Sequence, residues 1–251
     1  MENNLPLKEL LYKLADNQLI YGHRNSEWIG LGPLLEEDIS FASIAQDKVG
    51  QSRMLYTMLQ RLGESDPDTI AFMRNASQFH CCHLVQYPTI NYEEALVRHF
   101  LFDHAEKVIF GALRSSSSVD LAAFAAKFAG EINYHVLHAD SIIKKMANGT
   151  EESKIRIANA LAFWGPDAFA IFEPGPYEAE LVSDGIATSC ASLLATWVAE
   201  VNTLLAKYEL PLLSAANQAA FGGRGGHHTE HLQPMLDEMA EVYRLDPTAE
   251  W

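Results

Sequence analysis

Long helical patterns with short breaks between them occupy almost all of this 251-residue chain. Apolar residues recur every three or four positions, as in Leu7, Leu10, Leu11 and Leu14, and this spacing gives a helix one apolar face. The sequence shows no convincing strand pattern and no convincing internal repeat. The predicted helices cover 6–28, 36–62, 67–73, 91–114, 119–146, 151–172, 187–208 and 229–243.

Turn and cap residues mark the breaks between these helices. Asn91 and Glu94 have the spacing of a capping box, and the short run 115–118 is typical of a tight helix–helix turn. Residues 222–228, with the sequence GGRGGHH, are predicted to form a flexible loop. Four long helices with short connections, and further helices behind them, predict an all-α bundle of up-down type. The length fits a single domain over 1–251.

The composition and net charge of the chain limit the kinds of molecule that it can bind. Apolar residues make up 48% of the chain and charged residues 20%, which is ordinary for a folded globular protein. The net charge of −15 argues against binding nucleic acid, which requires a basic surface, and against an anionic membrane surface. The charge is explained either by solubility or by an acidic face that docks on a basic partner.

Cysteine usage and the N-terminal sequence indicate the compartment. The chain has three cysteines, Cys81, Cys82 and Cys190, and they form no Cys-x-x-Cys pair that would favour a disulfide framework or a thiolate metal site. The first 18 residues are polar and amphipathic, and no run of 18 apolar residues occurs. The sequence therefore predicts a soluble, cytoplasmic protein.

Several polar residues fall on apolar helix faces, where a folded chain would bury them. They are Gln18, Lys48, Gln51, Asp103 and His135. A buried charge is costly unless it is paired, so Asp103 needs a partner, and Lys48 is the natural candidate. A lysine that extends its amine into solvent is the alternative for Lys48, and a hydrogen-bonded core histidine is the alternative for His135.

Five sequence blocks, in order and at matching spacing, resemble one known family. They are LADNQLI at 14–20, EWIG at 27–30, the pattern D-x-x-GQ-x-R at 47–53, DTIAFMR at 68–74, and GGRGGHHTEHLQPMLDEM at 222–239. Over nearly its whole length the chain is similar to the structural subunits of bacterial ring-1,2-phenylacetyl-CoA epoxidases. These epoxidases are multicomponent monooxygenases of the ferritin-like superfamily, and they act in aerobic phenylacetate degradation.

The resemblance implies a fold, a function and a set of partners. The fold is a ferritin-like four-helix bundle with additional helices. The function is that of a non-catalytic subunit that docks and stabilises a catalytic ferritin-like subunit in a hetero-oligomer. The catalytic partner would carry di-iron, and a separate reductase would carry flavin and an iron–sulfur cluster. This chain itself would carry no cofactor.

The resemblance also implies that the metal site of this chain is degenerate. Six positions correspond to di-iron ligands of the related catalytic subunit: Gln18, Lys48, Gln51, Asp103, Ile132 and His135. A Glu-x-x-His pair on one helix face can reach into a bundle core, but Lys48 and Gln51 offer an ammonium and a neutral amide instead. Asp103 and His135 alone cannot hold two irons, so we expect no catalytic or metal-binding residue here.

The tail and the acidic residues leave alternatives open. The candidate contacts to the partner are His228, Glu230 and His231, and these residues could equally hold the tail against the bundle. The same histidines could form a metal site, but the segment can also be explained by a helix that begins with Thr229 as its cap. A second hypothesis is an active di-iron or di-manganese protein. It would use Glu36, Glu37, Glu131, His135 and the region His228–His231. A plain helical binding module is the third hypothesis.

Overall fold

The computed structural model of the protein describes residues 4–249. The chain forms two compact units. The first unit consists of Met1–Gly30, Leu34–Pro88 and Gly222–Trp251, and the second of Leu31–Pro33 and Thr89–Phe221. The N-terminal and C-terminal segments therefore share one unit, and the middle of the chain forms the other. The expectation of a single domain over 1–251 stays a prediction.

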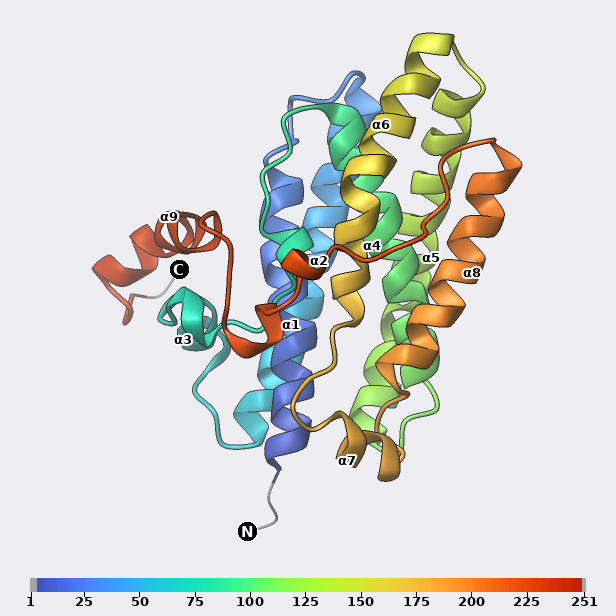
Figure 1. The fold of residues 1–251 in the computed structure, drawn as a ribbon. Helices are drawn as coiled ribbons and strands as arrows, with labels where there is room; N and C mark the ends of the chain where they lie inside the picture. The colour runs from blue at the N-terminus through green and yellow to red at the C-terminus, as the bar shows by residue number, and fades with distance from the viewer. Residues whose placement is uncertain (1–3, 250–251) are drawn as a thin grey trace. The chain divides into compact units, whose positions relative to one another are not determined.

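Two long helices that lie side by side form the core of the first unit (Figure 1). They are α1 (Leu5–Ser26) and α2 (Leu35–Arg61). Gly22 permits their close approach, because a Cβ atom at this position would lie 3.0 Å from Val49 Cγ2 and 3.2 Å from the Ala45 carbonyl oxygen. A larger residue there would push the two helices apart.

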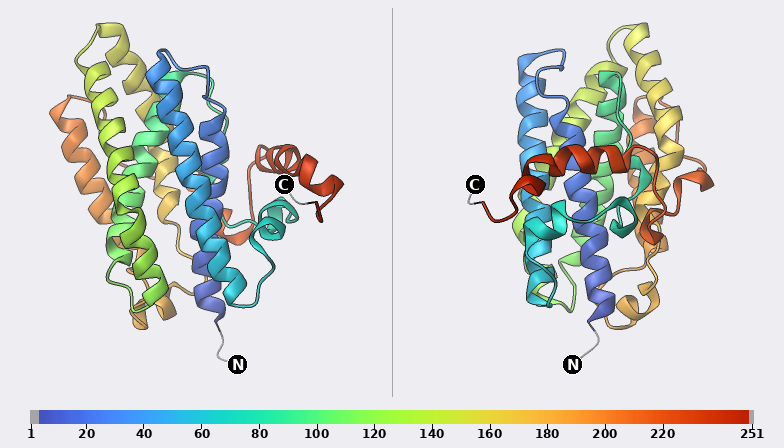
Figure 2. Two further views of the ribbon diagram at one scale, coloured as in Figure 1. Left: turned by 180° about the vertical axis from the view of Figure 1, so that it is seen from behind. Right: turned by 90° about the vertical axis from the view of Figure 1, so that its left-hand side faces the viewer.

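Short helices complete the first unit. They are α3 (Pro67–Phe72), η1 (Ala76–Gln78), η2 (His83–Val85), η5 (Gly223–Gly225) and α9 (Leu232–Leu245). The Asp66 side chain caps α3 by accepting a hydrogen bond from the Thr69 backbone N–H at 3.0 Å. Figure 2 shows α9 beside α3, where the rings of Phe72 and Tyr243 are 5.2 Å apart. The tail thus returns to the N-terminal part of the chain.

The second unit contains the other long helices. They are α4 (Tyr92–Leu113), α5 (Val119–Ala147), α6 (Glu151–Ala168) and α8 (Cys190–Lys207), with the short helices η3 (Phe169–Phe172), α7 (Glu178–Ser183) and η4 (Gln218–Ala220). α4 packs against α5, α6 and α8, and every residue from Ala95 to Glu106 is buried. Trp197 on α8 donates its indole N–H to the Leu101 carbonyl oxygen at 3.1 Å. α4 is therefore the central helix of this unit.

The predicted all-α class and ferritin-like helical architecture are confirmed. Residues 4–249 form no strand, and the capping box at Asn91 and Glu94 opens α4 as expected. One boundary differs because of proline chemistry. The helix expected over 151–172 ends at Ala168 and continues as the 3₁₀ helix η3, because Pro166 lies inside its last turn and has no N–H to donate.

Other boundaries were wrong for local reasons. α8 begins at Cys190 instead of 187, because Ser189 accepts a hydrogen bond from the Ser192 backbone N–H at 3.3 Å and caps the helix. The last helix begins at Leu232 instead of 229. The short helix α7 was not predicted at all. No helix within residues 4–249 is long and apolar enough to cross a membrane.

Candidate functional site

Three of the predicted degenerate metal-site positions lie buried in the first unit. Gln18 on α1 is 2% exposed, and Lys48 and Gln51 on α2 are 0% exposed. The Lys48 amine lies 5.8 Å from the centroid of the Tyr21 ring, within the range of a cation–π contact. The alternative of a solvent-facing Lys48 is therefore wrong. A buried ammonium repels a metal cation, so this position cannot act as a ligand while it is charged.

The other three positions lie in the second unit. The Asp103 carboxylate on α4 is fully buried and has two histidine partners. It lies 2.6 Å from His99 Nδ1 and 3.1 Å from His135 Nδ1, and each carboxylate oxygen faces one ring. Both nitrogens must carry a proton to donate to an ionised carboxylate. Ile132 is 2% exposed and contributes only apolar surface.

A further histidine extends this cluster. His99 Nε2 lies 3.2 Å from His138 Nδ1, and because His99 holds its proton on Nδ1, its Nε2 accepts this hydrogen bond. Burial lowers the pKa of His99 below its usual value, and the nearby Asp103 carboxylate opposes this shift. His99 and His138 were not among the residues predicted from the sequence. Their spacing gave the only signal: His99 lies four residues before Asp103, and His138 lies three after His135.

This donor set does not fit a di-iron centre. Each iron needs several oxygen or nitrogen donors, but the Asp103 oxygens and the facing Nδ1 atoms of His99 and His135 are already bonded to one another. Within residues 4–249, no group of three or more His, Cys, Asp or Glu side chains is arranged to hold a metal ion. An ion pair between Lys48 and Asp103 stays a prediction.

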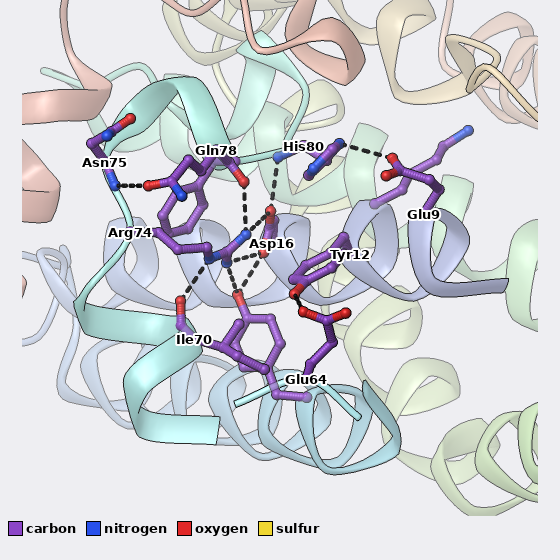
Figure 3. A network of polar contacts seen from close by, with 12 residues as sticks. Glu9, Tyr12, Asp16, Glu64, Ile70, Arg74, Asn75, Gln78 and His80 are labelled. Atoms are coloured by element: carbon purple, nitrogen blue, oxygen red, sulfur yellow. Dashed lines mark hydrogen bonds and ion pairs between the residues drawn. The ribbon is translucent and has the colours of Figure 1, made fainter. Parts of the chain in front are cut away.

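A second polar network is centred on Asp16 in the first unit (Figure 3). The Asp16 carboxylate accepts hydrogen bonds from Arg74 Nη2 at 2.6 Å and Nη1 at 3.1 Å, which is a bidentate pair. It also accepts from the Tyr56 hydroxyl at 2.6 Å and from the His80 backbone N–H at 2.7 Å. The Arg74 guanidinium lies 4.0 Å from the centroid of the Phe79 ring. Both oxygens of this carboxylate are therefore satisfied.

The electrostatics of this network favour the charged pair. Burial by itself would lower the pKa of Arg74, but the Asp16 carboxylate, Tyr56 and Tyr12 together outweigh burial, and the pKa is raised above its usual value. Burial and the same carboxylate raise the pKa of the Tyr56 hydroxyl well above its usual value. Arg74 is therefore a permanent cation, and Tyr56 a permanent hydrogen-bond donor, at any pH at which the protein is folded.

The tail joins this network through Arg224, which corrects the prediction of a flexible loop at 222–228. Arg224 is only 4% exposed, and its Nη1 donates to Asn17 Oδ1 at 3.0 Å and to the His80 carbonyl oxygen at 2.5 Å. A Cβ atom at Gly223 would overlap the Cys81 carbonyl oxygen. The glycines thus allow close backbone contact.

The predicted contact residues of the tail have different surroundings. His228 Nε2 lies 2.8 Å from the Phe79 carbonyl oxygen and its Nδ1 lies 2.8 Å from Gln86 Nε2, so both ring nitrogens have partners inside the chain. The side chain of Glu230 is 90% exposed, and that of His231 is 36% exposed. His228 thus locks the tail onto its own unit. A partner contact through Glu230 and His231 stays a prediction.

The residues of the enzyme alternative lie on separate elements. Glu36 and Glu37 occupy the first turn of α2, Glu131 and His135 lie on α5, and His228 lies in the tail. Thr229, the predicted helix cap, does not cap α9. Instead its hydroxyl donates to Gln86 Oε1 at 2.9 Å, which strengthens the lock on the tail.

The fold and the two clusters define a class of protein: an all-α, ferritin-like chain with a buried aspartate–histidine cluster in one unit. In the other unit the sequence blocks at 14–20, 68–74 and 222–239 meet around Asp16, Arg74 and Arg224. The chain belongs to the family described as "Phenylacetic acid catabolic protein", whose model matches residues 1–251. It is similar to one of the subunits of the 1,2-phenylacetyl-CoA epoxidase of Escherichia coli (strain K12). The two are 34% identical over 242 residues, which cover 95% of this chain and 96% of the relative.

Proposed function

We propose that this chain is a non-catalytic structural subunit of a multicomponent di-iron monooxygenase that epoxidises phenylacetyl-CoA in phenylacetate catabolism. The relative's name supports membership of such a complex. The observation that carries the non-catalytic assignment is the chemistry of the six degenerate positions. A buried ammonium, two amides and an isoleucine replace four ligands, while Asp103 and His135 are bonded to each other.

The proposal assigns the missing chemistry to partners. A catalytic subunit of ferritin-like fold would hold the di-iron centre, and a reductase with flavin and an iron–sulfur cluster would supply electrons. This chain would bind the catalytic subunit in a cytoplasmic hetero-oligomer and stabilise it. A catalytic bundle places carboxylates in its core, which weakens packing. A partner whose own core is filled by hydrogen-bonded side chains can compensate for that loss.

Co-expression with the catalytic subunit of the same organism tests this function. We expect affinity capture of this chain to recover the catalytic subunit, and metal analysis to give about two irons per catalytic chain. This chain purified alone is expected to contain no stoichiometric iron or manganese. Two metals per chain in the isolated protein would favour the enzyme alternative, and failure to capture the catalytic subunit would favour the plain binding module.

A matched variant separates support from catalysis. His135→Gln removes one of the two remaining ligand types but keeps a hydrogen-bond donor for Asp103. If the cluster only fills the core, the reconstituted complex keeps its iron content and its turnover of phenylacetyl-CoA. A loss of activity from a complex that still assembles and still holds its iron would contradict the non-catalytic assignment.

A further inference from the structure

The second unit has a surface groove with an apolar lining and a cationic rim, and the proposed role as a structural subunit gives this groove no task. It lies between α4 and α5 and has a volume of about 210 Å³. Its lining residues are Lys107, Phe110, Gly111 and Arg114 of α4, and Ala125, Ala129, Ile132 and Asn133 of α5. The space exists because three of these residues are glycine or alanine. A Cβ atom at Gly111 would have no other heavy atom within 4 Å.

The floor of the groove is apolar and buried. Phe110 and Ile132 are each 2% exposed, and Ala125 is 0% exposed. These side chains close the bottom of the groove, and the apolar surface left for a ligand to cover lies on Gly111, which is exposed, and on Ala129, which is partly exposed. The volume is too small for a partner helix, and it matches a body about the size of one phenyl ring or a short branched alkyl chain.

The rim of the groove is cationic, although the chain has a net charge of −15. Arg114 is exposed, and its guanidinium makes no hydrogen bond or ion pair with the described residues 4–249. Lys107 has one partner, Glu200, at 3.4 Å, and both side chains are 44% exposed. Exposed pairs of this kind are weak, so the Lys107 amine can turn toward an anion in the groove.

We propose that this groove binds a small organic carboxylate with an aromatic or branched alkyl body. The carboxylate accepts two hydrogen bonds from the Arg114 guanidinium, whose planar fork matches carboxylate geometry. The body lies over Gly111 and Ala129, above the buried Phe110 and Ile132, and Asn133 on α5 offers an amide. Arg114 at the C-cap of α4 also lies where a cation suits the helix dipole, but that role does not require a hollow beside it.

Titration of the full-length chain with phenylacetate tests this site. Alanine methyl groups labelled with ¹³C report binding directly, because Ala125 and Ala129 line the groove. We expect saturable shifts of these two signals with a Kd below about 1 mM, the range for a ligand of this size in an open site. 2-Phenylethanol, which has a similar body and no charge, should bind at least about tenfold more weakly.

Three variants locate the ligand. Arg114→Gln should weaken phenylacetate binding at least about tenfold, and Gly111→Leu should abolish it by filling the groove. Lys127→Gln is the matched control, because Lys127 is also a cation on this helix pair but does not line the groove. It should leave the Kd unchanged. Circular dichroism checks that each variant is folded, and the exposed Arg114→Gln change carries the test if Gly111→Leu does not fold.

The outcomes that overturn the proposal are distinct from failure of the structural function. The proposal fails if phenylacetate does not saturate the wild-type signals by about 10 mM, ten times the expected Kd. It also fails if Arg114→Gln and Lys127→Gln bind alike. If the free chain does not bind phenylacetate but Arg114→Gln weakens capture of the catalytic subunit, the groove receives a partner side chain instead.

Discussion

Two buried aspartates of this protein have hydrogen-bond partners of different kinds. Asp16 in the first unit accepts two hydrogen bonds from Arg74 and one from the Tyr56 hydroxyl. Asp103 in the second unit has two histidines, His99 and His135, on its two oxygens. Arginine stays charged at every pH that a folded protein meets, but histidine loses its charge near neutrality. One cluster is therefore fixed, and the other responds to pH.

The two clusters also differ in the parts of the chain that they join. Asp103, His99 and His135 lie on two neighbouring helices of the second unit, α4 and α5, and their ring nitrogens and carboxylate oxygens bond to one another. Asp16 and Arg74 join segments that are far apart in the sequence, and Arg224 brings in the tail. A cluster that holds three segments together needs partners whose charge does not change.

Breaking the fixed cluster should have the largest effect on stability. Arg74→Met leaves the fully buried Asp16 carboxylate without its cation, and the free energy of unfolding should fall by about 3–5 kcal/mol. Denaturant titration measures this. The double variant Asp16→Asn, Arg74→Met should recover part of the loss, because no charge is then stranded. A loss below about 1 kcal/mol in the single variant, the size of an exposed pair, would show that the pair is dispensable.

The glycines of the tail should come next. Gly223→Ala places a methyl group against the Cys81 carbonyl oxygen, so the backbone must shift, and the cost should be about 2–3 kcal/mol. Gly225→Ala is the matched control, because its Cβ would meet only His227 Cδ2 at 3.8 Å. Limited proteolysis should release the tail in Gly223→Ala and spare it in Gly225→Ala. Equal proteolysis rates in the two variants would contradict the close contact of the tail.

Acid should affect the histidine cluster and spare the arginine cluster. Burial lowers the pKa of His99, so the unfolded chain takes up a proton on this residue more readily than the folded chain. This contribution to stability is complete above about pH 6.5 and is lost as the pH falls below it. We expect the free energy of unfolding to decrease between pH 7 and pH 5, measured by chemical denaturation at each pH.

A variant assigns this pH dependence to its source. His99→Gln keeps a donor for Asp103 and does not titrate, so the slope of stability against pH should become flatter. His228 contributes in the same direction, because burial lowers its pKa to about 4, and His228→Gln should remove that share. The contrast between the clusters breaks down if Arg74→Met, and not His99→Gln, changes the slope.

The sequence determined the class of fold and the chemical character of the degenerate positions. Helical periodicity depends only on local spacing, so the long helices were predicted to within a few residues. The residue types at Lys48 and Ile132, an ammonium and an alkyl chain, are poor iron ligands whatever surrounds them, so the expectation of a degenerate metal site needed the sequence alone. Family membership followed from the same local patterns, which include the blocks that contain Asp16, Arg74 and Arg224.

Only the tertiary structure decided which polar residues meet. His99 and His138 join Asp103 because α4 and α5 run side by side, and no local pattern specifies that pairing. The run GGRGGHH was expected to be flexible because glycine is permissive in isolation. In the folded chain that permissiveness allows the backbone at Gly223 to approach Cys81. Hydrogen bonds between segments distant in the sequence depend on packing, and packing is a property of the whole fold.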